Sequence, residues 1–169
     1  TSDMPVPFTP ERTAHFKTAQ EYASRIEIQE LSDFFVLYER FIGNYVELEK
    51  HWYRFLDLYQ AYLQEETILV ERFFNDPAIT NSSQCICDIC MTVGEECGLD
   101  NLMRIQGGRW VVYHFDGEIK DIFETLQGIF NVWLPRSGYR MAQRYGLNIY
   151  RHIDREKHRV RMDLCIPIS

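Results

Sequence analysis

An approximate internal repeat is the feature of this sequence that most restricts its fold. The segment FVLYERFIGNYVELEKHWYRFLDLYQ starts at Phe35, and RWVVYHFDGEIKDIFETLQGIFNVWL starts at Arg109. Each copy reads as a strand, a turn that contains glycine, and a helix, so the sequence predicts one supersecondary unit built twice. An offset of 74 residues aligns Phe41 with Phe115, Gly43 with Gly117, Leu48 with Ile122, Leu56 with Phe130, and Tyr59 with Trp133.

Apolar residues recur at steps of three and four in the second part of each copy, which predicts an amphipathic helix there. Pro135 and Gly138 are expected to end the second helix, because proline lacks an N–H and glycine favours the left-handed cap. The first stripe consists of Tyr45, Leu48, Trp52, Phe55, Leu56, Tyr59, Tyr62 and Leu63, and the second of Ile119, Ile122, Phe123, Leu126, Ile129, Phe130 and Trp133.

Strand-like stretches surround both predicted helices. They lie at about 67–75, 84–93, 139–152 and 159–168, with shorter ones at 24–31 and 101–106. The order β-β-α-β-β, repeated twice, predicts an α+β domain with mainly antiparallel sheets, each covered by one helix. We expect this domain at 24–169, with halves at about 24–93 and 102–169. Residues 1–23 are expected to form a tail or linker, with a short helix at about 10–23.

Composition restricts the class of protein further. The chain of 169 residues is 46% hydrophobic and 14% aromatic, which excludes a disordered protein. Its net charge of −7 argues against direct binding to nucleic acid, which needs clustered Lys and Arg. No apolar run approaches the ~20 residues of a membrane span, and the N-terminus does not resemble a signal peptide. We expect a cytoplasmic protein without a membrane partner.

Alternation along the last strand places one carboxylate opposite its apolar face. Val160, Met162 and Leu164 share the face that must pack on a helix, and Asp163 points to the other side. An offset of 75 pairs this residue with Asp88, which occupies the same position in the stretch SQCICDICMTV. The sequence therefore predicts one carboxylate in the middle of each half, on the face away from the helix.

The cysteines of that stretch are interpreted as structural. Cys87 and Cys90 point to opposite sides of a strand, so they cannot share one ion, and no nearby histidine adds a ligand. Buried cysteine behaves as a small apolar residue. A metal or redox site is the alternative for this stretch, but we expect no metal and no cofactor. Reduced thiols fit the five cysteines, at 85, 87, 90, 97 and 165.

An ordered set of motifs resembles the GyrI-like family, the AraC-type effector-binding domain of multidrug-sensing bacterial regulators. The resemblance spans about residues 24–169. It rests on FVLYERFIGNY (35–45), DPAIT (76–80), CDICMTV (87–93), GGRWVVYHFDG (107–117), VWLPRSGY (132–139) and MDLCIPI (162–168).

The resemblance implies a duplicated βαββ fold of the SHS2 type with a central ligand cleft that takes aromatic, often cationic, molecules. An acidic residue of the family in the last strand corresponds to Asp163, where Glu is usual. A second family acid corresponds to Asn148, which leaves the cleft with less negative charge, whereas Tyr150 is retained. With these three residues, Tyr38, Trp110, Trp133 and Tyr139 are the candidate ligand-binding set.

Each candidate also has a plain structural interpretation. Aromatic residues at helical or strand spacing are more often core than ligand contacts. Asp163 could pair with Arg161 on its own strand or with Arg140. If it is unpaired and buried, a cationic ligand is the partner that would offset the cost of its burial, with aromatic rings adding cation–π attraction of about 0.5–2 kcal/mol each.

Three functions are compatible with this reading. The first is a ligand sensor, as part of a transcription regulator or as a free-standing relative, with DNA bound only through a separate domain. The second is a small-molecule hydrolase with Asp163 as general base, although we assign no catalytic residue. The third is an inhibitor that binds a basic protein partner. The sequence identifies neither the natural ligand nor the oligomeric state, and a homodimer stays open.

Overall fold

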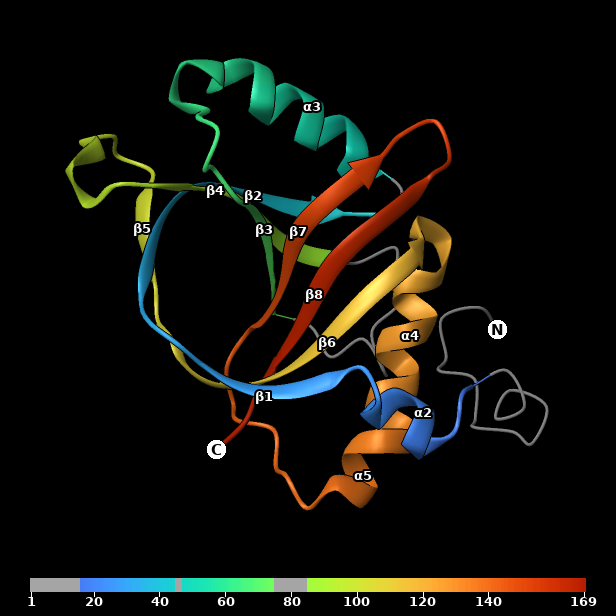
Figure 1. Ribbon diagram of the computed structural model, residues 1–169. Coiled ribbons are helices and arrows are strands. Elements are labelled where there is room, and N and C mark those ends of the chain that lie inside the picture. The colour runs from blue at the N-terminus through green and yellow to red at the C-terminus, as the bar shows by residue number, and fades with distance from the viewer. Residues whose placement is uncertain (1–15, 45–46, 75–84) are drawn as a thin grey trace.

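The computed structural model describes residues 16–44, 47–74 and 85–169 (Figure 1). Within them the elements follow the order β-β-α-β-β twice, after one short helix, as expected. The strands are β1 (Ile26–Leu31), β2 (Phe34–Gly43), β3 (Leu69–Phe73), β4 (Cys85–Val93), β5 (Leu102–Ile105), β6 (Gly108–Glu118), β7 (Gly146–Asp154) and β8 (Arg159–Pro167). The α-helices are α2 (Ala19–Ala23), α3 (Leu48–Leu58), α4 (Ile122–Gly128) and α5 (Leu134–Ser137).

All eight strands belong to one antiparallel sheet, in the order β1-β6-β8-β7-β3-β4-β2-β5. The α+β class is confirmed, but the expectation of separate sheets, one for each helix, is wrong. Strands β3 and β7 pair from Val70 with Ile149 to Phe73 with Gly146, and this seam joins the two halves. In addition, β1 pairs with β6 and β5 pairs with β2, so each half gives its first strand to the other.

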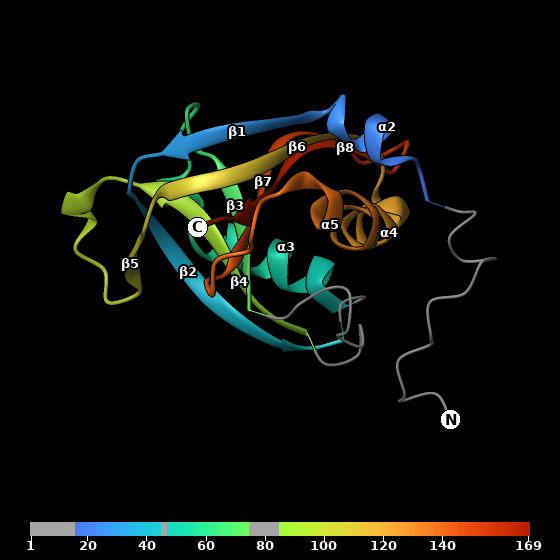
Figure 2. The same ribbon diagram turned by 90° about the horizontal axis from the view of Figure 1, so that it is seen from below.

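The sheet curls strongly because its two ends are tied together (Figures 1 and 2). Only residues 32–33 connect β1, at one end of the sheet, with β2, which lies next to the other end. Residues 106–107 make the matching connection from β5 to β6. The connections touch, since the Gly107 N–H donates to the Asp33 carboxylate at 2.7 Å and a side chain on Gly107 would collide with the Leu31 carbonyl.

Three apolar clusters fill the molecule. One joins α4 to β6 and β8, and a second joins α3 to β2 and β4. The third lies on the opposite face of the sheet, where Val36 of β2 and Trp110 of β6 meet although their strands are far apart in the sheet. We call the side of the sheet covered by α3 and α4 the helix face, and the opposite side the inner face. Tyr150 on β7 packs against both helix-face clusters.

Of the two residues expected to end the second long helix, Gly138 does end it, but Pro135 lies inside it. After α4 a π-helical segment, Ile129–Trp133, leads directly into α5, and the helix ends where Gly138 adopts a φ of 80°. The π turn changes the hydrogen-bond register, so Pro135 falls in the first turn of α5, where a missing N–H costs little. The strand expected from residue 139 begins only at Gly146. No helix in the described ranges is long and apolar enough to cross a membrane.

Several predicted features lie outside the described residues. They are Tyr45, the DPAIT motif, the side chain of Cys85 and the part of the N-terminal helix before residue 16. The rest of that helix is α2, and its Tyr22 is only 2% exposed within the α4 cluster.

Candidate functional site

The seven candidate residues do not come together in one place but fall into three groups. Asn148 and Tyr150 lie on the helix face at the seam; Trp133 and Tyr139 lie at the end of the second long helix; Asp163, Trp110 and Tyr38 lie on the inner face.

A buried carboxylate occupies the middle of the helix face. Glu71 on β3 has no exposed surface, and its carboxylate accepts three hydrogen bonds. The Tyr150 hydroxyl donates at 2.6 Å, the Trp52 indole at 2.7 Å and the Asn148 amide at 3.3 Å. The four side chains come from β3, β7 and α3, so they connect the two halves of the sheet with the first long helix.

All three donors to Glu71 are neutral. Among the described residues no cationic side chain forms an ion pair with it. Burial raises the pKa of the Glu71 carboxyl above its ordinary value, and the hydrogen bonds from Tyr150, Trp52 and Asn148 oppose that rise. A buried carboxylate without a cation is costly, so this site would gain from a positively charged partner.

The seam places Glu71 directly opposite Asn148 in the pairing of β3 with β7. The resemblance implied that the site has one carboxylate fewer than is usual, because Asn148 stands at the position of a family acid. In the structure a carboxylate reaches the same place from the neighbouring strand. The Asn148 side-chain oxygen, also buried, has no hydrogen-bond partner among the described residues. The site therefore offers a carboxylate and an unused amide oxygen side by side.

Aromatic rings enclose this carboxylate. Trp52 and Tyr150 meet edge to face, with ring centroids 5.9 Å apart. Trp52 is 9% exposed, while Tyr150 is partly exposed and lies between the α3 and α4 clusters. Rings in this arrangement can hold a flat or cationic molecule by stacking and cation–π attraction.

Trp133 and Tyr139 form a separate aromatic pair. Their rings are stacked with centroids 6.2 Å apart and planes 21° apart. The Arg109 guanidinium lies 5.6 Å from the Tyr139 ring centroid. Both aromatic residues belong to the α4 cluster, which also includes Tyr150.

Asp163 lies on the inner face and is already paired with basic side chains. Its carboxylate contacts His114 Nδ1 at 2.8 Å and the Arg151 guanidinium at 3.0 Å. These are not the partners considered from sequence, Arg161 and Arg140. The hydrogen bond to Asp163 raises the pKa of His114, and Glu27, 3.3 Å from its Nε2, acts in the same direction.

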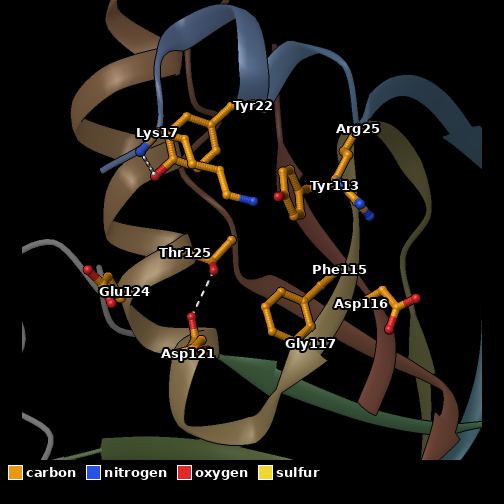
Figure 3. A pocket seen from close by; sticks show the side chains of 10 residues that line it. All are labelled: Lys17, Tyr22, Arg25, Tyr113, Phe115, Asp116, Gly117, Asp121, Glu124 and Thr125. Carbon is orange, nitrogen blue, oxygen red and sulfur yellow. Dashed lines mark hydrogen bonds between the residues drawn. The ribbon is translucent and has the colours of Figure 1, made fainter. Parts of the chain in front are cut away.

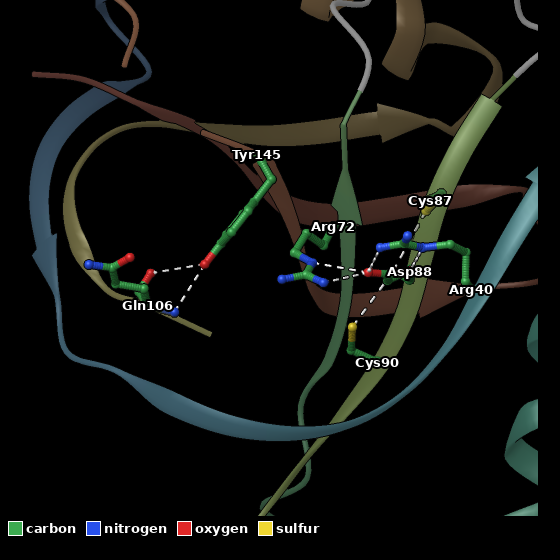
Figure 4. Close-up of polar contacts among 7 residues, drawn as sticks. All are labelled: Arg40, Arg72, Cys87, Asp88, Cys90, Gln106 and Tyr145. Carbon is green, nitrogen blue, oxygen red and sulfur yellow. Dashed lines mark hydrogen bonds and ion pairs between the residues drawn. The ribbon is translucent and has the colours of Figure 1, made fainter. Parts of the chain in front are cut away.

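The first half repeats this arrangement around Asp88, which is fully buried. The Arg40 guanidinium binds both carboxylate oxygens at 2.9 and 3.2 Å, and Arg72 binds one oxygen at 2.7 Å (Figure 4). Arg40 faces Asp88 across β2 and β4 as His114 faces Asp163 across β6 and β8, which confirms that the two carboxylates are repeat partners.

The cysteines of β4 behave as the strand reading predicted. Cys87 packs in the α3 cluster and Cys90 in the inner-face cluster, on opposite sides of the sheet. Burial, followed by the charge of Asp88, raises the pKa of the Cys90 thiol, so this thiol stays protonated. Among the described residues no three His, Cys, Asp or Glu side chains lie close enough to hold a metal ion.

The two remaining aromatic candidates lie on the inner face. Trp110 is fully buried, and the Arg144 guanidinium lies 4.9 Å from its ring centroid. Tyr38 packs against the same cluster from β2. Neither residue approaches the carboxylate at the seam, because the sheet itself lies between them.

Glu71 and Trp52 were not singled out from the sequence as site residues. A signal for Glu71 exists in TILVERFFN, where Glu71 shares the helix-facing alternation of Leu69 and Phe73. A charged residue in an apolar slot is informative, because it must find partners inside the protein.

Comparison with known proteins identifies relatives by sequence and further relatives by fold. Over 103 residues the chain is 32% identical to the probable transcriptional regulator YgiV of Escherichia coli K12, which covers 57% of this chain and 64% of YgiV. The chain thus spans less than two thirds of that relative.

Two solved structures share the fold. The C-terminal domain of EcmrR superimposes with a TM-score of 0.72 at 11% identity, over 85% of this chain and 96% of that domain. SAV2435 bound to tetraphenylphosphonium gives a TM-score of 0.54 at 10% identity, over 85% of this chain and 93% of that chain.

A family model described as a GyrI-like small molecule binding domain matches residues 24–169. With the curled eight-stranded antiparallel sheet and the two helices on one face, this match shows that the chain belongs to the GyrI-like family.

Proposed function

We propose that this chain is a sensor domain that binds an aromatic cation at Glu71, between the two long helices. It acts as the effector-binding domain of a bacterial transcription regulator or as a free-standing relative, and any contact with DNA is made by a separate domain. The description of the family as small-molecule binding, the name of YgiV and the tetraphenylphosphonium bound to SAV2435 all support this assignment.

The observation on which the proposal rests is the buried carboxyl group of Glu71. Its carboxyl group is buried, and the donors it has among the described residues, Trp52, Tyr150 and Asn148, are all neutral. At an effective dielectric constant of about 20, a unit positive charge 4 Å away interacts with a carboxylate by about 4 kcal/mol. A monocation would therefore gain most of its binding energy from this one group, and the flanking rings would add stacking.

The proposal keeps Tyr150 and Asn148 from the original candidate set and replaces Asp163 with Glu71 as the counter-charge. Asp163 is a poorer choice because His114 and Arg151 already offset its charge. Trp133 and Tyr139 are proposed as aromatic contacts at the α4 side, since they share a cluster with Tyr150. Trp110 and Tyr38 are proposed as core residues of the inner face.

Binding of a ligand at Glu71 can change the position of α3 directly. The ligand must replace at least one of the three donors, and Trp52 is the one that α3 supplies. A cation that displaces the Trp52 indole favours a state in which α3 is released from the seam. Such a difference in affinity between two states is what a sensor requires.

Titration with an aromatic cation tests the proposal. Tetraphenylphosphonium should quench tryptophan fluorescence saturably, and Glu71→Gln should raise its Kd about 30- to 700-fold, which corresponds to about 2–4 kcal/mol. The variant should fold. The oxygen of the new glutamine amide still accepts hydrogen bonds from Trp52 and Tyr150, and its N–H group can donate to the oxygen of Asn148 once the Asn148 amide has rotated. Asp163→Ala is the control and should leave Kd within about twofold.

Two outcomes would contradict the proposal. One is saturable binding that Glu71→Gln does not weaken while Asp163→Ala does, which would return the counter-charge to Asp163. The other is binding that neither substitution affects, which would place the cation elsewhere in the molecule.

A further inference from the structure

A pocket of about 210 Å³ lies between the N-terminal segment, β6 and α4, and Glu71 is not among the residues that line it. Its walls are the segment before β1, the end of β6 and the first turn of α4 (Figure 3). Ligand pockets for drug-sized molecules measure about 300–1,000 Å³, so this one suits a smaller molecule built on a single ring.

The N-terminal segment that forms one wall is anchored firmly. Thr18 and Glu21 form a reciprocal capping box at the start of α2, and Tyr22 is buried against α4. Gly128 makes this possible, because a side chain there would overlap the Tyr22 phenol. The family match starts at residue 24, so Lys17 and Tyr22 bring to the pocket side chains from outside the matched span.

The pocket combines an apolar wall with unused hydrogen-bond donors. Tyr22, Tyr113 and Phe115 supply the rings. Tyr113 is only 2% exposed, and among the described residues its hydroxyl has no hydrogen-bond partner. The Lys17 ammonium forms no ion pair with a described residue, and its side chain extends toward the middle of the pocket (Figure 3). A phenol hydroxyl and an ammonium that line the same space and have no partner among the described residues suit an anion.

The acidic residues of the pocket limit the charge of that anion. Asp116 is paired with Arg159 at 3.6 Å, whereas Asp121 and Glu124 lie in the first turns of the helix on the opposite wall. Two carboxylates on that side would repel a second negative charge. A ligand with a single carboxylate can direct this group at Lys17, away from Asp121 and Glu124.

We propose that this pocket is a second ligand site for a small aromatic monoanion, a one-ring carboxylate. Its carboxylate accepts from the Lys17 ammonium and the Tyr113 hydroxyl, and its ring packs on Tyr22 and Phe115. The site is independent of the cation site at Glu71 and prefers the opposite charge. A ligand here contacts both the N-terminal segment and α4, so its binding stabilises their docking.

Benzoate, benzyl alcohol and benzylamine are suitable probes, because they share one ring and differ in charge. In amide chemical-shift titrations benzoate should bind saturably, more tightly than the other two, with shifts centred on residues 17–25 and 113–125. Lys17→Met should raise the Kd of benzoate about tenfold or more, and Lys17→Arg should restore most of the affinity. Lys157→Met, at the exposed β7–β8 turn, makes the same charge change away from the pocket and should leave Kd within about twofold.

Tyr113→Phe tests the second donor without altering the ring, and should raise Kd about three- to tenfold. The proposal is overturned if benzoate shows no saturable binding, or binds no better than benzylamine. It is also overturned if Lys17→Met and Lys157→Met weaken binding equally, or if the shifts centre on Glu71. Lys17 is exposed and lies outside the core, so Lys17→Met should stay folded, and a higher Kd in this variant reports a lost contact with benzoate.

Discussion

Gly128→Ala is a sharp test of how the N-terminal segment is held, because two opposing effects act at one position. Gly128 has ordinary helical backbone angles, φ −63° and ψ −42°. Replacing glycine by alanine inside a helix normally stabilises a protein by about 1 kcal/mol. Here the new methyl group would overlap the phenol of Tyr22, which is almost fully buried.

The steric effect should win. Overpacking of a well-packed core costs about 1–3 kcal/mol, and expelling an aromatic side chain costs about 3–5 kcal/mol. The overlap with Tyr22 is deep, so we expect a steric cost between these cases, of about 2–4 kcal/mol. After subtracting the gain in helix propensity, Gly128→Ala should lower the free energy of unfolding by about 1–3 kcal/mol. In a Tyr22→Ala background the obstacle is gone, so the same substitution should raise it by about 1 kcal/mol. The effect of Gly128→Ala thus changes sign between the two backgrounds.

Urea unfolding followed by tryptophan fluorescence measures all four proteins of this cycle. We expect a coupling energy of about 2–4 kcal/mol between positions 22 and 128. Equal effects of Gly128→Ala in both backgrounds would refute the claim that Tyr22 docks on Gly128. Stabilisation of the protein that retains Tyr22 would refute it as well.

Two further predictions concern the inner face. Asp88→Ala should lower the free energy of unfolding by about 3–5 kcal/mol, because it leaves the buried Arg72 without its carboxylate. Asp163→Ala should lower it by only about 1–2 kcal/mol, since His114 and Arg151 are nearly half exposed. Urea unfolding measures both variants, and the opposite ranking would contradict this prediction. His114 has a raised pKa in the folded protein, so its contribution to stability is full below its ordinary pKa of about 6.5 and is lost as pH rises through the folded value. His114→Gln should remove that part of the pH dependence, and an unchanged profile of unfolding free energy between pH 5.5 and 8 would show that His114 does not cause it.

Local patterns made much of the fold predictable. The alternation in the last strand correctly separated Asp163 from the apolar residues around it, and the offset of 75 correctly paired it with Asp88. Helical spacing identified Trp52 and Phe55 as core-facing residues of α3. These successes share a cause, because each depends only on the period of one element.

The features that sequence reasoning missed depend on how elements meet. The exchange of β1 and β5 between halves follows from connections of only two residues, which no periodicity reveals. Asp163 was expected to pair with Arg161 or Arg140, but the register of β7 against β8 brings Arg151 within reach instead. Likewise, the contact between Glu71 and Asn148 depends on the pairing of β3 with β7, so Glu71 was not identified as a site residue from the sequence.

The seam also supports the proposal that the ligand of this site carries one positive charge. Like charges directly opposite on paired strands repel, so acids at both 71 and 148 would oppose each other. With asparagine at 148, the amide donates to Glu71 and the pair has a single ionisable group inside the protein. One carboxylate can offset one cation, and a second cation would be left buried without a partner. In the proposed function, Glu71 on β3 supplies the single counter-charge from the strand next to Asn148.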